Sequence, residues 1–363
     1  MGDAPPQEHL VVVLPFRELT DIFEDIRDKF PSIRLTFIDP RSTDMSGPEV
    51  KDLWASATIL STLWDVPEIE EAPRLKLIQS IAAGVDGMIH RPIVANTDII
   101  VASASGIHGP PIAEWVVMNW LVSSRLYDTT AEWQRNHNWN EDKNSLLDKI
   151  EDNVGKRVGI LGYGSIGRQI ARVSVAMGMK VLAYTFSPRD TPESRRDTGY
   201  IVPDTGDPDG TLPISWHSGS DKASLHAFLS QNLDHLLISV PLTTQTTKFI
   251  GAEEISILSK SCTRTTRRPY ITNIARGKVI DQDALIASLK SRELGGAALD
   301  VADPEPLPKD HPLWEAPNLK FSPHVSGLGI EYMGRAFDVL KVNMRRLERG
   351  EELINVYRRK KGY

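Results

Sequence analysis

Three side chains suited to acid–base and anion-binding chemistry follow successive strands predicted in the last third of the chain. Arg276 stands in NIARGKVID, Glu305 in LDVADPEPL and His324 in FSPHVSG. Arginine binds carboxylates through paired hydrogen bonds, and histidine exchanges a proton near neutral pH. Because ligands of open α/β sheets bind outside the carboxyl ends of the strands, we expect these side chains to face one crevice. Asp300, from the same segment as Glu305, should face it too.

A second group of residues forms a glycine motif of the kind that binds dinucleotides. The sequence RVGILGYGSIGRQIA places Gly162, Gly164 and Gly167 between a predicted strand and a predicted helix. The first glycine permits the tight turn, the second lets a pyrophosphate approach the backbone, and the third lets the helix pack closely on the sheet. N–H groups at the start of that helix, at Ser165 and Ile166, then meet the phosphates. This context favours a dinucleotide site over a bare glycine-rich turn.

The segment after the second strand of this unit lacks the carboxylate that is usual in such sites. An acidic residue there would bind the adenosine ribose hydroxyls and would repel a 2′-phosphate. The sequence YTFSPRD instead offers Thr185, Ser187 and Arg189. Since a guanidinium suits a phosphate, we predict that NADP(H) is preferred over NAD(H). The alternative is that Arg189 only stacks on the adenine, which would leave NAD(H) usable and the preference mixed.

Together these segments resemble the D-isomer-specific 2-hydroxyacid dehydrogenases, the family that includes glyoxylate/hydroxypyruvate reductases. The resemblance covers most of the chain beyond about residue 75. It implies an NAD(P)H-dependent reduction of a 2-keto acid to a D-2-hydroxy acid. The matching motifs are SIAAGVDG, GILGYGSIGRQIA, VPLTTQTTKFI, NIARGKVIDQDAL, ALDVADPEPLPKDHPLW, SPHVSG and GEELINVYRRKKGY.

The resemblance also implies a role for each residue of the predicted crevice. His324 is expected to donate the proton that the forming alkoxide needs. Glu305 is expected to hydrogen-bond to the imidazole, which fixes its tautomer and favours its cationic form. Arg276 would bind the carboxylate and ketone oxygens of the substrate. Backbone N–H groups at Ala83 and Gly84 would also hold the substrate carboxylate, because small residues permit that close approach.

Further cofactor contacts are implied by the same resemblance. Asp300 is expected at the nicotinamide ribose or carboxamide, with a plain strand-end cap as its alternative. The remaining contacts follow predicted strands. Val240 and Pro241 are expected beside the adenosine, and Thr246 is expected near the phosphates. Ile274 and Ala275 are expected around the nicotinamide. No metal is expected in the site.

Two other function classes share this scaffold. A dinucleotide-sensing corepressor-like protein would bind partner peptides, but the sequence contains no evident disordered regulatory tail. A formate dehydrogenase-like enzyme carries glutamine where Glu305 stands, because no proton moves to or from an alkoxide in that reaction. Glu305 therefore favours the reductase.

Two segments are longer than the family's usual connections. Residues 190–219 are rich in Pro, Gly and Asp, and residues 260–269 form a shorter basic insertion. Loops of this length in compact domains are usually functional or disordered. We expect the first to be an ordered surface flap that could cover the adenosine end of the cofactor.

Strands and helices alternate along the chain, which predicts a doubly wound α/β protein with two Rossmann-like domains. Continuous apolar strands between helices predict parallel sheets covered on both faces. By resemblance, a discontinuous substrate-binding domain (1–124 plus 327–363) holds an inserted dinucleotide-binding domain (125–326). Crossings near 123–125 and 326–329 would form a hinge whose closure excludes water. The predicted strands are Leu10–Pro15, Arg34–Asp39, Ala57–Thr62, Leu75–Gly84, Val158–Leu161, Val181–Tyr184, His235–Pro241, Tyr270–Ala275, Gly296–Val301 and Leu319–His324.

The composition favours a cytoplasmic enzyme or binding protein. The net charge of -6 argues against a nucleic-acid partner. Cys262 is the only cysteine, so an intramolecular disulfide is impossible and a reducing compartment is expected. The most apolar predicted helix, Ile112–Leu126, is interrupted by polar residues and is shorter than the about 20 apolar residues that a bilayer requires. No membrane partner is therefore expected.

The predicted helix Ile112–Leu126 and the sequence AEWQRNHNW after it carry more apolar side chains than a solvated surface needs. In the family that the chain resembles, this region builds a two-fold dimer. An apolar patch here would suit such a self-complementary interface, so we expect a homodimer.

Overall fold

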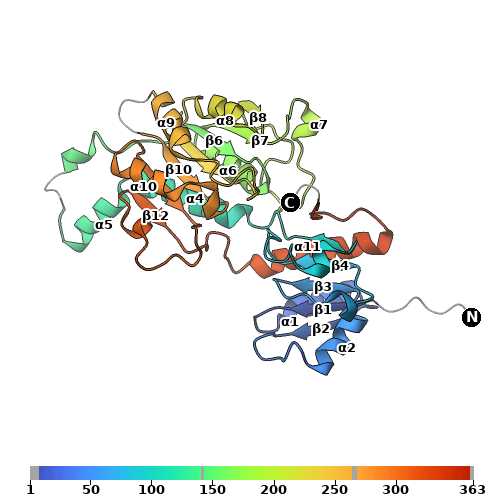
Figure 1. Ribbon diagram of the computed structural model, residues 1–363. Coiled ribbons are helices and arrows are strands. Elements are labelled where there is room, and N and C mark those ends of the chain that lie inside the picture. Colours follow the sequence, from blue (N-terminus) through green and yellow to red (C-terminus); the bar gives the residue numbers. More distant parts are fainter. Residues whose placement is uncertain (1–7, 140–142, 264–267, 360–363) are drawn as a thin grey trace, which may run out of the picture. The chain divides into compact units, whose positions relative to one another are not determined.

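The computed structural model describes residues 8–139, 143–263 and 268–359, and the chain divides into two compact units (Figure 1). Unit 1 consists of Met1–Ile107, Thr198–Tyr200 and Ile330–Tyr363, and unit 2 of His108–Asp197 and Ile201–Gly329. Each unit contains its own parallel sheet with a hydrophobic core on either face. Among the described residues, no helix combines the length and the apolar character needed to cross a membrane.

Unit 1 is built on five parallel strands, in the spatial order β2 (Arg34–Ile38), β1 (His9–Val13), β3 (Ile59–Thr62), β4 (Leu77–Ser80) and β5 (Ile100–Ala102). Its helices are α1 (Thr20–Lys29), α2 (Pro48–Ser56), the 3₁₀ helix η1 (Ile69–Glu71), α3 (Pro92–Ala95) and α11 (Tyr332–Arg349). Strand β1 is fully buried, and successive residues of a strand face opposite sides. Leu10 and Val12 pack with α1 and α11, whereas Val11 and Val13 pack with α2 and α3.

Unit 2 is built on seven parallel strands, in the order β12 (Leu319–Phe321), β11 (Gly296–Leu299), β10 (Tyr270–Asn273), β9 (His235–Ile238), β6 (Arg157–Leu161), β7 (Lys180–Thr185) and β8 (Ser215–Ser218). One face packs against α4 (Gly109–Ser124) and α6 (Ser165–Ala176). The other packs against α8 (Lys222–Leu229), α9 (Ala252–Ser261) and α10 (Gln282–Lys290). Its shorter helices are α5 (Tyr127–Arg135), η2 (Lys143–Leu146), α7 (Pro192–Arg195), η3 (Gly277–Val279) and η4 (Pro312–Glu315).

The predicted doubly wound parallel sheets are confirmed, and each predicted strand is present. Most are shorter than predicted, whereas β6 and β7 extend beyond the predicted bounds. Two observed strands were not predicted. β5 is only three residues long, and β8 consists of four half-buried residues with two serines at the edge of its sheet. Neither carries the long apolar run by which a central strand of a parallel sheet is recognised.

The segments expected to be irregular are partly regular. Residues 190–219 contain α7 and β8, in keeping with an ordered segment. Of the basic insertion 260–269, residues 264–267 lie outside the described part of the chain.

Apart from the short stretch Thr198–Tyr200, the chain passes between the compact units at Ile107/His108 and at Gly329/Ile330. The second point adjoins the expected crossing near 326–329. At the first, α4 groups with unit 2, whereas the expected boundary at residue 124 placed this helix in the substrate-binding domain. The assignment of substrate binding and cofactor binding to the two parts of the chain stays a prediction.

Candidate active site

His324 and Glu305 form a hydrogen-bonded pair beyond the carboxyl end of β12. Nδ1 of His324 lies 2.9 Å from Oε2 of Glu305, and the other carboxylate oxygen accepts the backbone N–H of Ala302 at 3.0 Å. A carboxylate oxygen accepts hydrogen bonds, so this contact assigns His324 the tautomer with the N–H at Nδ1. The two side chains are 49% and 36% exposed. Nε2 of His324 has no protein partner among the described residues, so it is accessible to a substrate.

The loop that carries His324 is organised by the buried carboxylate of Asp300. One carboxylate oxygen accepts Ser322 Oγ at 2.6 Å and Val325 N at 2.9 Å. The other accepts the backbone N–H of Ser326 at 3.0 Å and its hydroxyl. The backbone N–H of His324 donates to the Asp300 carbonyl at 2.8 Å, and the histidine has a left-handed φ of 56°. Asp300 therefore caps this strand end, as the alternative interpretation expected, and its contact with a dinucleotide stays a prediction.

Two serines of this loop were missed by sequence reasoning. Ser322 and Ser326 flank His324 two residues away on either side, in the sequence SPHVS, and both donate their hydroxyl groups to Asp300. The spacing was visible, but only the fold brings residues 22 and 26 positions apart into contact.

Arg276 follows β10, next to the strand that leads to Glu305. Its Nη1 donates to the carbonyl of Ala275 at 2.8 Å, and its side chain is half-buried. The next residue, Gly277, packs so tightly that a Cβ there would lie 2.0 Å from the carbonyl group of Ala302. Since β10, β11 and β12 are neighbours and parallel, the segments that carry all three predicted catalytic residues leave the sheet at the same edge.

The glycine motif has the geometry that a dinucleotide requires. Gly162 has a φ of 103°, and a Cβ there would lie 2.7 Å from the backbone of Ser239. A Cβ on Gly167 would lie 2.4 Å from the Gly162 carbonyl oxygen, whereas one on Gly164 would meet no atom within 4 Å. Open space at the second glycine is what a pyrophosphate needs, and no side chain caps the start of α6. These residues fit a dinucleotide.

The other predicted cofactor residues surround this edge of the sheet. Val240 and Pro241 follow β9, and the Thr246 hydroxyl holds the same turn by donating to the Pro241 carbonyl at 2.7 Å. Ile274 and Ala275 follow β10 and are buried. Their strands lie between the strand before the glycine motif and the strand before Asp300, so the fold brings all of these segments to one edge.

Ser187 and Arg189 lie just beyond β7, also at this edge. Ser187 is exposed, and its carbonyl accepts the Thr185 hydroxyl at 2.8 Å. Arg189 is half-buried, its Nη1 donates to the carbonyl of Ser194, and its own carbonyl accepts Arg195 Nε at 2.8 Å. The turn that follows Arg189 in the chain therefore holds this residue in place.

Ala83 and Gly84 lie in unit 1, in the loop after β4. The loop begins with a turn in which the backbone N–H of Ala82 donates to Ser80 Oγ at 3.1 Å. Ala83 is exposed and Gly84 is half-buried, which leaves their backbone close to the surface of unit 1.

A second histidine–glutamate pair lies in unit 2, between α8 and α9. His226 Nε2 is 2.8 Å from Glu254 Oε1, which also accepts Lys222 Nζ at 2.9 Å, while the other oxygen accepts the N–H of Gly251 at 2.9 Å. His226, Glu253 and Glu254 offer ligand-type atoms within 4.8 Å of one another, but the ammonium on Glu254 would repel a metal ion. Burial raises the pKa of Glu254, and these three donors outweigh it and lower that pKa to about 2.

Comparisons with known proteins agree on one family. The family model for the D-isomer specific 2-hydroxyacid dehydrogenase NAD binding domain matches residues 117–204 and 212–326, more than half of the chain. A glycerate dehydrogenase from Methylorubrum extorquens is 30% identical over 281 residues, covering 76% of this chain and 77% of that protein. A glyoxylate reductase from Korarchaeum cryptofilum is 27% identical over 312 residues, covering 86% of this chain and 85% of that protein.

Solved structures give the same result. The structure of an NADPH-dependent glyoxylate/hydroxypyruvate reductase from Sinorhizobium meliloti, in complex with NADP and sulfate, matches with a TM-score of 0.73 at 25% identity. The match covers 98% of this chain and 100% of that chain. The stretch that the family model leaves out, residues 205–211, lies in the long segment between β7 and α8.

Proposed function

The chain belongs to the D-isomer specific 2-hydroxyacid dehydrogenases, oxidoreductases that use a nicotinamide dinucleotide, and we propose that it reduces a small 2-keto acid to the D-2-hydroxy acid with NADPH. The observation that carries the proposal is the His324–Glu305 pair, which leaves Nε2 accessible at the sheet edge where the glycine motif lies. An acid held by a carboxylate at this edge suits proton transfer to a forming alkoxide.

We assign one role to each of the three residues. The nicotinamide, when bound, supplies the hydride. His324 donates the proton from Nε2 to the ketone oxygen, and Glu305 holds the other ring nitrogen, which orients the ring and stabilises the imidazolium before transfer. Arg276 binds the substrate carboxylate and ketone oxygens, because a guanidinium places paired N–H groups on one side. The backbone N–H groups of Ala83 and Gly84 are proposed as further carboxylate ligands.

The residues that would hold the dinucleotide follow from the same edge. Gly162, Gly164 and the first N–H groups of α6 would hold the pyrophosphate. Ser187 and Arg189 would hold the adenosine 2′-phosphate. This proposal is supported by the position of the Arg189 guanidinium just beyond β7. The proposed nicotinamide neighbours are the segment Ile274–Ala275 and the loop capped by Asp300.

Steady-state assays test the reaction. Glyoxylate, hydroxypyruvate, pyruvate and phenylpyruvate should each be offered with NADPH and with NADH, and dinucleotide oxidation followed by absorbance. We expect turnover of at least one keto acid, with a lower KM for NADPH than for NADH. The absence of turnover with every keto acid would refute the reductase proposal.

Replacement of Arg189 tests cofactor preference. In Arg189→Ala, the KM for NADPH should rise by about 10-fold, the size of one lost charge-assisted hydrogen bond, and the KM for NADH should change little. Equal changes in the KM for NADPH and the KM for NADH would mean that the guanidinium does not bind the 2′-phosphate.

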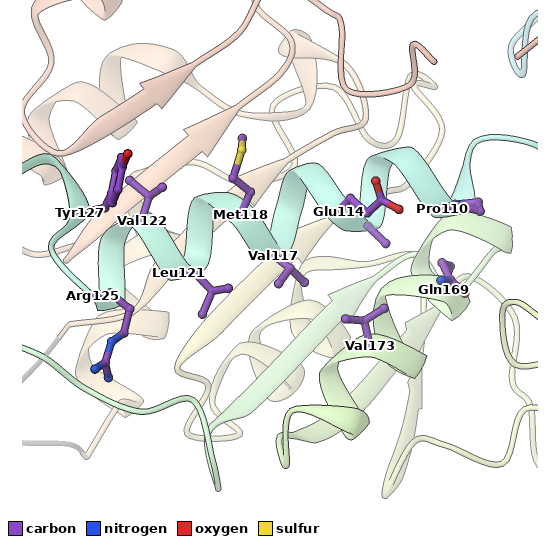
Figure 2. Close-up of a pocket in the computed structure, with 11 residues that line it drawn as sticks. Pro110, Glu114, Val117, Met118, Leu121, Val122, Arg125, Tyr127, Gln169 and Val173 are labelled. Atoms are coloured by element: carbon purple, nitrogen blue, oxygen red, sulfur yellow. The ribbon is translucent and has the colours of Figure 1, made fainter. Parts of the chain in front are cut away.

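A homodimer is proposed from the outer face of α4. This helix is apolar on nearly every side: Ile112, Val116 and Trp120 are buried, whereas Met118 and Leu121 are 51% and 39% exposed. Figure 2 shows Val117 and Leu121 pointing from α4 toward the side where α6 presents Val173, and these residues line one apolar pocket. An exposed apolar patch of this kind marks an interface.

Light scattering coupled to size exclusion checks this interface. The chain should elute with twice its mass of 40.4 kDa, and Leu121→Glu should shift it to a monomer. A monomeric wild type would remove the proposal. A cytoplasmic location is proposed as well, from the single, buried cysteine.

A further inference from the structure

The long segment between β7 and α8 is bound to the glycine motif itself. Tyr163, the residue between the first two motif glycines, donates its hydroxyl to Asp207 Oδ2 at 2.7 Å. Asp207 is only 4% exposed, and its carboxylate also accepts the backbone N–H groups of Thr211 and Leu212 at 3.0 and 3.2 Å. The turn at 207–212 is therefore tied to the loop proposed to hold the pyrophosphate.

Arg168 makes the second and larger attachment. It follows the last motif glycine on α6, and its side chain is 5% exposed. Its guanidinium donates to the carbonyls of Asp207 and Arg195, the latter at 2.6 Å, and lies 3.4 Å from the carboxylate of Asp197. It also lies over the Tyr163 ring, 5.1 Å from the centroid. A buried guanidinium is costly unless its donors are satisfied, and here it ties three parts of one segment to the glycine-motif helix.

A short path of hydrogen bonds leads from Arg168 to Arg189. The carbonyl of Arg195 accepts from Arg168, and the Arg195 side chain donates Nε to the carbonyl of Arg189 at 2.8 Å. The Arg195 guanidinium also lies over the Trp216 ring, 5.6 Å from its centroid. Arg189 in turn donates Nη1 to Ser194, the residue before Arg195. The turn of residues 189–195 is thus closed on itself and attached to α6 through Arg168.

We propose that Arg168 is a positioning residue for cofactor selectivity: it holds the turn of residues 189–195 so that the Arg189 guanidinium is preset for the adenosine 2′-phosphate. This inference rests on the proposed NADPH preference. Five N–H donors leave Arg189 further donors besides the one given to Ser194. A guanidinium that is already ordered loses less side-chain entropy when the phosphate binds. An ordered turn therefore raises the affinity for NADP(H) and leaves the affinity for NAD(H) unchanged.

A purely electrostatic effect must be separated from positioning, because Arg168 is itself a cation. Arg172 supplies the matched control. It lies one turn further along α6, is exposed, and reaches the long segment only through a 3.4 Å contact with the Gly206 carbonyl. Arg172→Met removes the same charge from the same helix and leaves the turn attached.

The test is calorimetric binding of two probes to the full chain: adenosine 2′,5′-bisphosphate and 5′-AMP, which differ only in the 2′-phosphate. In Arg168→Met, affinity for the bisphosphate should fall about 10-fold, the worth of one charge-assisted hydrogen bond, while affinity for 5′-AMP should change less than about 2-fold. Arg168→Lys, which keeps one donor, should recover part of the loss, and Arg172→Met should behave as wild type. In a double-mutant cycle, the losses in Arg168→Met and Arg189→Ala should be less than additive.

The outcomes separate the two proposals. If the wild-type chain binds both probes equally, the NADPH preference fails, and the positioning role fails with it. If the wild type prefers the bisphosphate but Arg168→Met weakens both probes alike, or Arg172→Met matches it, only the positioning role is overturned. Should Arg168→Met not fold by circular dichroism, Asp197→Asn decides instead. It removes the carboxylate that lies 3.4 Å from the Arg168 guanidinium and leaves α6 unchanged, so it should lower bisphosphate affinity selectively. An equal loss for both probes would overturn the positioning role.

Discussion

The described part of unit 2 contains two histidine–glutamate pairs, which are almost alike in distance and differ in their surroundings. His324 Nδ1 lies 2.9 Å from Glu305, and His226 Nε2 lies 2.8 Å from Glu254. The side chain of Glu254 is 3% exposed, whereas that of Glu305 is 36% exposed. Glu254 also accepts from an ammonium and a backbone N–H. The short distance alone therefore does not distinguish a catalytic pair from a structural one.

What differs is the free side of each imidazole and the place of each pair in the sheet. The His324 pair follows the carboxyl end of β12, where ligands of parallel sheets bind, and Nε2 has no partner among the described residues. The His226 pair joins α8 to α9 on one covered face of the sheet. The comparison teaches that the two pairs differ in accessibility and in their place in the sheet, which is why His324 is the proposed proton donor and the His226 pair is a contact between two helices.

The largest expected effect comes from His324→Ala. Removing the proton donor should lower kcat by about 10²–10⁴-fold, the usual contribution of a positioned acid. The matched control is His226→Ala, which should leave kcat within about 2-fold, because it removes a contact between α8 and α9 and none of the assigned catalytic groups. Steady-state kinetics with the best keto acid measures both. An unimpaired His324→Ala enzyme would refute the role of His324 as proton donor, because the two histidine–glutamate pairs would then have the same effect on kcat.

Glu305→Gln should give a smaller loss. The amide can still hydrogen-bond to the ring but no longer stabilises an imidazolium, so kcat should fall by about 10-fold, at the scale of one charge-assisted hydrogen bond. The KM for the keto acid should change little, since the carboxylate of Glu305 does not bind substrate in this mechanism. A change confined to KM would argue instead that Glu305 contacts the substrate.

Glu254→Gln should affect stability and not catalysis. Replacing a buried carboxylate that accepts three hydrogen bonds should lower the free energy of unfolding by about 2 kcal/mol. Urea unfolding followed by circular dichroism measures this, with Glu253→Gln as the control, an exposed neighbour on the same helix. If the kcat of the folded Glu254→Gln enzyme fell as far as that of Glu305→Gln, the contrast between the pairs would be lost.

The smallest effect is the dependence of that stability difference on pH. The folded-state pKa of Glu254 is lowered from 4.5 to about 2, so its stabilisation is complete above pH 4.5 and is lost as pH falls toward 2. The gap between wild type and Glu254→Gln should narrow over this range, because other acidic groups titrate in both proteins. Parallel stability curves down to pH 2 would show that Glu254 is not stabilised in its ionised form.

Much of the candidate site could be predicted because it depends on local patterns. Buried apolar runs marked the strands, and a strand followed by Gly162-x-Gly164-x-x-Gly167 marked the turn with its left-handed φ of 103° at Gly162. In a parallel sheet, all residues that follow strands reach one edge, so Arg276 and His324 could be placed together without coordinates.

Other features depended on contacts that no local pattern contains. The sequence showed residues 190–219 as polar and irregular, yet Asp207 is buried against the glycine motif. Asp300 was read first as a cofactor ligand, and its carboxylate oxygens accept four hydrogen bonds from the loop of His324. A carboxylate at a strand end is consistent with either role. The neighbouring loop shows that Asp300 caps the strand end, and its contact with a dinucleotide stays a prediction.

For this protein, the sequence by itself determined the parallel sheets, the end of the sheet at which the reaction is proposed and the residue types gathered there. Strand periodicity, glycine conformational freedom and side-chain chemistry are properties of short segments. They can be recognised in the sequence because they do not depend on contacts with distant residues. The tertiary structure alone decided which donors each carboxylate receives and how far each is buried. Those depend on residues such as Arg168 and Asp207, 39 positions apart, meeting in a packed interior, and such meetings are a property of the whole fold.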